Sequence, residues 1–101
     1  MGIDVPAAKR PALIDPGDAG AQPFREIDLC LGGGRNESGH VVVFASAWPG
    51  EGTTTVASNY AIAASRREQR VLLVDANLDG PSLHALFDVP RTPGLVDILS
   101  Y

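Results

Sequence analysis

The sequence predicts an α/β protein, and three consecutive segments carry that prediction. Residues 41–45 form an uninterrupted run of β-branched and aromatic side chains with a final alanine, which is typical of a strand buried on both faces. Residues 53–68 are rich in alanine and contain no glycine or proline, so they favour a helix. Residues 71–74 form a second apolar run. A strand, a helix and a strand in this order predict a parallel pair with a right-handed crossover.

The region before these segments differs in composition. Residues 1–40 contain seven of the eleven glycines and four of the eight prolines, which disfavours regular structure. Apolar side chains recur at helical spacing only between residues 23 and 31. We therefore expect a flexible tail and linker over residues 1–39 with one short helix over residues 23–31. A single domain is expected over residues 40–101.

Composition excludes several functional classes. The chain has 101 residues and a net charge of −4, which argues against a nucleic-acid-binding surface. A single cysteine, Cys30, excludes an internal disulfide and a cysteine-rich metal site. No run reaches the roughly 20 apolar residues of a membrane span, and no secretory signal pattern opens the chain. These features together predict a cytoplasmic protein.

The loop between the first expected strand and the helix has features of a phosphate-binding site. Residues 47–54 place Gly50 and Gly52 just before a helix start, where backbone N–H groups can wrap phosphate oxygens. Thr54 stands where such phosphate loops (P-loops) hold Mg²⁺ through a hydroxyl. Thr53, however, replaces the lysine that reaches the outer phosphates. An ordinary glycine-rich turn is the alternative interpretation of this loop.

Four motifs carry a resemblance to a known family. The chain reads S-A-W-P-G-E-G-T-T-T over residues 46–55 and L-L-V-D-A-N-L-D over residues 72–79. It continues with P-S-L-H over residues 81–84 and G-L-V-D-I-L over residues 94–99. In order and spacing these motifs resemble the cytoplasmic domain of bacterial tyrosine kinases that partner exopolysaccharide chain-length regulators. That family belongs to the MinD/ParA class of P-loop ATPases.

The resemblance implies a fold, a reaction and a set of site residues. The fold is a P-loop NTPase-type parallel sheet with helices, of which residues 40–101 would form only the N-terminal half. The cofactor is ATP with Mg²⁺, and the reaction transfers the γ-phosphoryl group to tyrosine hydroxyls. Thr54 and Asp75 match the family's metal-site positions, and Asp75 also matches a position that accepts the substrate proton. Nucleotide binding is assigned to Pro49, Gly50, Glu51, Gly52, Thr53, Thr54 and Thr55.

The departures from the family pattern fall at the positions that the family uses for catalysis and for binding ATP and Mg²⁺. Thr53 replaces the loop lysine, and Asn77 replaces the second aspartate of a D-x-D pair, so two charges are missing. Asp79 replaces an arginine. The family's Walker B strand and tyrosine cluster would lie beyond Tyr101. We therefore expect a degenerate, pseudokinase-like module with little or no catalysis and weak ATP and Mg²⁺ binding.

A further family segment, E-x-x-R-x-x-R, drives assembly of subunits into a ring. Here the matching positions hold Gln22, Arg25 and Asp28, so only the central arginine is kept. Because Asp28 reverses the sign of the last charge, it would add repulsion between neighbouring subunits. The sequence therefore predicts that the ring does not form.

Two other functions stay open at this point. The chain could be a non-catalytic interaction module that binds a membrane polysaccharide co-polymerase or another kinase copy, peripheral to the inner membrane through that partner. It could also be an ordinary ATPase of the MinD/ParA class. Trp48 disfavours the ATPase, because partition and division-site ATPases carry a signature lysine at this place.

Overall fold

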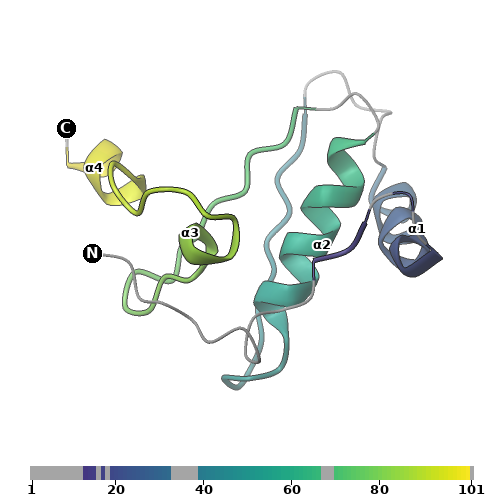
Figure 1. Cartoon of the computed structure of the whole chain (residues 1–101), viewed down its shortest axis with the longest axis horizontal. Coiled ribbons are helices and arrows are strands. Elements are labelled where there is room, and N and C mark those ends of the chain that lie inside the picture. The colour runs from purple at the N-terminus through teal and green to yellow at the C-terminus, as the bar shows by residue number, and fades with distance from the viewer. Residues whose placement is uncertain (1–12, 16, 18, 33–38, 67–69, 101) are drawn as a thin grey trace. The chain divides into compact units, whose positions relative to one another are not determined.

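Figure 1 shows a computed structural model of the chain. The structure describes residues 13–15, 17, 19–32, 39–66 and 70–100. The chain divides into two compact units, one over residues 12–72 and one over residues 73–101 with residues 1–11. Each unit is described by itself below. Much of the expected tail, including residues 1–12 and 33–38, lies outside the described residues.

The first unit opens with a short 3-10 helix, η2 (Ala19–Ala21), that leads into α1 (Gln22–Cys30). Pro23 lies in the first turn of α1, where a missing backbone N–H costs no hydrogen bond. Just after the helix, Gly32 adopts a φ of 80°, a left-handed conformation typical of a helix end. The bounds of α1 differ by one residue at each end from the helix expected over residues 23–31.

The second helix of this unit, α2 (Thr53–Ser65), forms in the alanine-rich segment. Its first intrahelical bond runs from the Val56 N–H to the Gly52 carbonyl at 3.0 Å. The helix ends three residues before the expected position, and residues 67–69 lie outside the described part of the chain.

α1 packs against α2, and their contact forms the core of the first unit (Figure 1). Small side chains dominate this core, so the two helices can approach closely. The ring of Phe44 packs on the ring of Tyr60 from a third segment, with centroids 5.3 Å apart and planes tilted by 53°. The buried residues of the unit are Ala21, Asp28, Ser58, Asn59, Tyr60, Ala61, Ala63 and Ala64.

The two segments expected to be strands are not strands within the described residues. Residues 41–45 and 71–74 form no ladder of backbone hydrogen bonds there. A strand requires such a ladder with a neighbouring strand, and an apolar sequence alone does not supply one. The parallel sheet of the expected α/β fold therefore stays a prediction.

The second unit contains two short helices, α3 (Leu83–Leu86) and α4 (Leu95–Leu99), which overlap the P-S-L-H and G-L-V-D-I-L motifs of the sequence. At α4 the Asp97 carboxylate caps the helix start, accepting from the Gly94 N–H at 2.6 Å. None of residues 73–100 is fully buried. This unit therefore lacks a closed apolar core over the residues that the structure describes.

Among the described residues, none of the helices has both the length and the apolar character needed to cross a membrane.

Candidate phosphate-binding site

The loop before α2 owes its shape to two glycines. Gly50 has a φ of 82° and Gly52 a φ of 86°, a region that residues with a Cβ rarely adopt. A Cβ at either position would meet no atom within 4 Å, so the backbone conformation and not a lack of space requires glycine. The Ser46 hydroxyl donates to the Trp48 carbonyl at 3.1 Å and fixes the entry to the loop.

The first turn of α2 presents unused hydrogen-bond donors. No side chain caps this helix, because Gly52 occupies the cap position. Within the described residues, the backbone N–H groups of Thr53, Thr54 and Thr55 donate to no protein acceptor. Their residues are half-buried. Three free donors at the positive end of a helix dipole can bind a phosphate oxygen.

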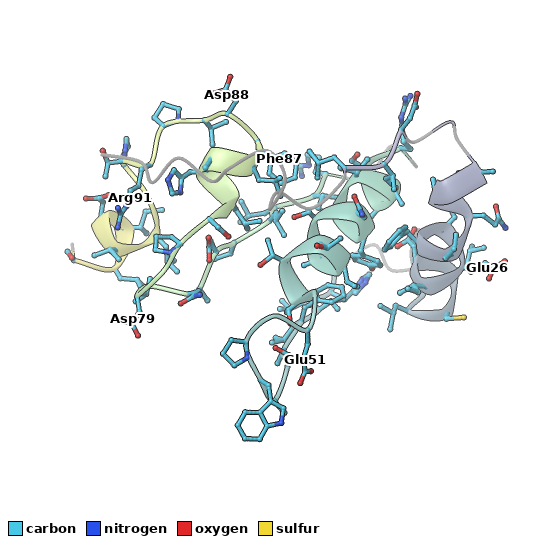
Figure 2. All side chains as sticks on the ribbon, turned by 60° about the horizontal axis from the view of Figure 1, so that its bottom comes forward. Glu26, Glu51, Asp79, Phe87, Asp88 and Arg91 are labelled. Atoms are coloured by element: carbon cyan, nitrogen blue, oxygen red, sulfur yellow. The ribbon has the colours of Figure 1, made fainter. Side chains whose placement is uncertain are left out.

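The loop itself carries little that could stabilise a developing charge. Thr53, at the place of the usual lysine, is neutral. Glu51 is exposed and lies on the loop that leads into α2 (Figure 2). Trp48 is 72% exposed. Phosphate binding here would rest on backbone donors and on the helix dipole, because the loop contains no cationic side chain.

Asp75, the candidate base and metal ligand, holds its own loop together. Its Oδ1 accepts from the Asn77 N–H at 3.1 Å. Its Oδ2 accepts from the Ser82 N–H at 2.8 Å and from the Leu83 N–H at 3.1 Å. A carboxylate offers about four lone-pair sites. Three are used here, so Oδ1 keeps the one free site.

Asn77 and Asp79, the two altered positions of the motif over residues 72–79, lie on the same loop as Asp75. The Asn77 side-chain oxygen accepts from the Gly80 N–H at 3.3 Å and closes the turn. Asp79 is exposed and points outward from the loop (Figure 2). Asn77 therefore has a structural task in this turn, and Asp79 contributes no hydrogen bond within the described residues.

The two candidate metal ligands lie in different units of the chain. Thr54 belongs to the first unit and Asp75 to the second. Over the described residues, no group of three or more His, Cys, Asp or Glu side chains could hold a metal ion. The loop residues thus fit a phosphate group, whereas Mg²⁺ binding by Thr54 and Asp75 stays a prediction of the resemblance.

The structure adds a buried polar contact that sequence reasoning missed. Asp28 is only 1% exposed, and its Oδ1 accepts a hydrogen bond from the Tyr60 hydroxyl at 3.3 Å. Burial raises the pKa of Tyr60, and the charge and hydrogen bond of Asp28 raise that pKa further. Beside this pair, the Asn59 side-chain oxygen accepts from the Ile14 N–H at 3.0 Å. These bonds join α1 and the segment before it to the helix that begins at the loop.

This contact corrects the role expected for Asp28. The sequence placed Asp28 on a subunit interface, where its charge would repel a neighbour. The structure instead buries Asp28 against α2, where it cannot face another subunit directly. Arg25, three residues earlier, donates through Nε and Nη2 to Gln22 Oε1 at 3.2 and 2.8 Å. The sequence signal for this burial is that Asp28 follows Phe24 by four residues and so shares its face of the helix.

Comparison with known proteins finds several bacterial relatives. Tyrosine-protein kinase YwqD from Bacillus subtilis is 41% identical over 58 residues, which are 57% of this chain and 24% of that protein. Succinoglycan biosynthesis transport protein ExoP from Rhizobium meliloti is 36% identical over 84 residues, 78% of this chain and 10% of ExoP. Tyrosine-protein kinase etk from Escherichia coli K12 is 29% identical over 90 residues, 88% of this chain and 12% of that kinase.

These matches relate the chain to bacterial proteins named tyrosine-protein kinases and to a protein named for succinoglycan biosynthesis transport. The chain spans a quarter or less of the length of each of these relatives. No protein-family model matches the chain. No solved structure matches it either.

Proposed function

We propose that this chain is a nucleotide-binding segment related to the tyrosine kinases of exopolysaccharide assembly, with little or no kinase activity of its own. One observation carries the proposal. The two left-handed glycines and the three free N–H groups of Thr53, Thr54 and Thr55 form a phosphate cradle at the start of α2. The likeness to YwqD and etk, which are named as kinases, supports ATP as the ligand.

The weak catalysis follows from the charges that phosphoryl transfer needs. That reaction depends on positioning and on neutralising the charge of the moving phosphoryl group. Thr53 supplies no charge, and the Asp75 carboxylate already accepts three backbone hydrogen bonds. Losing one preorganised donor typically lowers a rate by about 10²–10³-fold. Purified chain should therefore show no tyrosine autophosphorylation with ATP and Mg²⁺, as measured by anti-phosphotyrosine blotting and mass spectrometry.

The decisive experiment restores the missing lysine. Calorimetric titration with ATP and with pyrophosphate compares the wild-type chain with Thr53→Lys. One charged donor contributes about 1.5–3 kcal/mol, so the substitution should tighten binding by about 10- to 150-fold. Ser65→Lys is the matched control, because it adds the same charge to the exposed end of the same helix.

Two results would end the nucleotide proposal. One is equal ATP affinity in the wild-type chain and in Thr53→Lys. The other is an equal gain in Thr53→Lys and Ser65→Lys, which would show a general charge effect. The single tryptophan, Trp48, lies in the loop and is exposed, so its fluorescence reports loop occupancy independently of heat.

The proposed setting follows from the relatives. ExoP is named a succinoglycan biosynthesis transport protein, which supports a polysaccharide co-polymerase of the inner membrane as partner. The chain would act on the cytoplasmic side and reach the membrane through that partner. Co-purification with the membrane fraction, lost when the co-polymerase gene is deleted, would test this setting.

A specific observation also favours the second function, an interaction module. Val41, Val43 and Leu72 of the first unit are 91%, 82% and 86% exposed. Apolar side chains this exposed on one unit are unusual unless another surface covers them. The interaction module and nucleotide binding can coexist in one chain, because they use different residues.

A further inference from the structure

The phosphate loop joins two segments that contact each other through aromatic rings. Residues 41–45 lead into the loop, and α2 begins where the loop ends. The ring of Phe44, on the entering segment, packs on the ring of Tyr60 with centroids 5.3 Å apart. Tyr60 follows Thr53 by seven residues, about 10 Å along the helix axis. The ring contact therefore holds the entry of the loop against the side of α2.

A third segment fixes the Tyr60 ring at its far end. The buried Tyr60 hydroxyl donates to Oδ1 of Asp28, a residue of α1 that is itself buried. The ring thus has a packed face and a bonded hydroxyl, and tilting it would break one contact or the other. α1 thereby sets the orientation of the surface on which Phe44 packs.

The loop itself has little packing that could set its conformation. Residues 45–52 are all exposed. Gly50 and Gly52 have no side chains, and glycine reaches positive and negative φ values about equally well. The bond from the Ser46 hydroxyl to the Trp48 carbonyl is exposed and spans only two residues. The contacts at the two ends of the loop are therefore the main constraint on its geometry.

We propose that Phe44 and Tyr60 are positioning residues of the phosphate loop, with Asp28 fixing the Tyr60 ring. The proposal rests on the proposed nucleotide binding and adds which residues outside the loop set its geometry. A site built from backbone donors requires several N–H groups to point at one place. The loop meets the first turn of α2 in that geometry while its entry stays on the helix. Both rings act through the backbone that follows Phe44, and neither touches the ligand.

The single tryptophan, Trp48, reports the order of the loop without any ligand. Time-resolved fluorescence anisotropy of the full chain measures the amplitude of its fast local motion. Phe44→Leu removes the ring contact and keeps an apolar side chain, whereas Tyr60→Phe removes only the bond to Asp28. The amplitude should rise in both variants, and more in Phe44→Leu, because that change breaks the contact next to the loop.

Asn59→Ala is the matched control for both variants. Asn59 precedes Tyr60 on the same helix and is also buried, and its side-chain oxygen accepts from the Ile14 N–H at 3.0 Å. The control breaks a buried hydrogen bond of the same unit that involves neither ring. The motion of Trp48 should therefore stay as in the wild-type chain.

Each result of the anisotropy measurement decides a stated part of the proposal. A rise in Phe44→Leu and Tyr60→Phe but not in Asn59→Ala supports all of it. An unchanged amplitude in Phe44→Leu overturns it, and so does an equal rise in Asn59→Ala, which would indicate general loosening. An unchanged amplitude in Tyr60→Phe alone overturns the role assigned to Asp28.

Calorimetric titration with pyrophosphate separates this proposal from the nucleotide proposal. Phe44→Leu should weaken pyrophosphate binding by about 2- to 10-fold, the equivalent of one lost aromatic pair, and Asn59→Ala should leave it unchanged. Equal affinity in the wild-type chain and Phe44→Leu would overturn the positioning role and leave nucleotide binding intact. A wild-type chain that binds no pyrophosphate would end the nucleotide proposal, and the anisotropy would still decide whether the rings position the loop.

Discussion

Different interactions stabilise the interior of each of the two units. In the unit over residues 12–72, two helices pack around Tyr60 and a set of alanines, and eight of the residues that the structure describes there are buried. In residues 73–100 none is fully buried, and the loops are held by carboxylates such as Asp75 and Asp97 that accept backbone N–H bonds. The first unit therefore depends on a few buried side chains, whereas order in the second is local.

The largest effect should come from removing the centre of the first unit. Tyr60 is 7% exposed, contacts Phe44 and bonds to Asp28. Tyr60→Ala should lower the free energy of unfolding by about 3–5 kcal/mol, as for other buried aromatic side chains. Urea denaturation followed by far-UV circular dichroism measures this change.

The matched control for that substitution lies in the second unit. Ile98→Ala removes a large side chain that is 71% exposed, so it should change the free energy of unfolding by less than about 0.5 kcal/mol. Similar losses in the two variants would mean that the first unit has no special share in the stability of the chain.

The second-largest effect should come from Asp75, in the second unit. Asp75→Ala removes three hydrogen bonds at once, two of them to the first residues around the start of α3. Loss of such a cap costs about 1–2 kcal/mol, so the amides of Ser82 and Leu83 should exchange with deuterium about 5- to 30-fold faster. Exchange within α2 should not change, because the order of the second unit is local.

Asp79→Ala is the control for this experiment. It removes the same charge from the same loop, and Asp79 makes no hydrogen bond among the described residues. Equal acceleration in Asp75→Ala and Asp79→Ala would contradict a capping role for Asp75 and would leave net charge as the cause.

The sequence predicts local features of this chain better than tertiary ones. Helical periodicity predicted α1, and an alanine-rich composition without glycine or proline predicted α2. Gly50 and Gly52 indicated a turn, and both adopt positive φ values there. These features depend on neighbouring residues alone. The expected sheet is different, because a strand exists only with a partner, and residues 41–45 have none within the described chain.

The roles of the two aspartates show the same limit. Asp28 looked like a surface charge, but packing of α1 on α2 buries it beside Tyr60. Asp75 matched a catalytic position, and the closing of the loop onto Ser82 also gives it a structural task. Both results depend on contacts between residues that are distant in sequence, seven positions apart for Asp75 and 32 for Asp28. Spacing motifs do not encode such contacts.

The smallest effect concerns the hydroxyl of Tyr60. Tyr60→Phe keeps the ring and its contact with Phe44, and it removes only the hydrogen bond to Asp28. One such bond contributes about 1 kcal/mol, so the variant should unfold at slightly lower urea concentration near neutral pH.

The pH dependence of the stability difference between the wild-type chain and Tyr60→Phe tests whether the Tyr60 hydroxyl causes it. The folded chain raises the pKa of Tyr60 above its ordinary value near 10, first through burial and then through Asp28. Folding therefore favours the protonated hydroxyl. Its contribution is complete below the unfolded pKa of about 10 and is lost as pH rises through the folded pKa. The stability gap between the wild-type chain and Tyr60→Phe should shrink as the pH is raised above about 10, and any titration of Tyr101 cancels because both chains contain it. A gap that stays constant from about pH 8 to about pH 11 would show that folding does not shift the pKa of the Tyr60 hydroxyl.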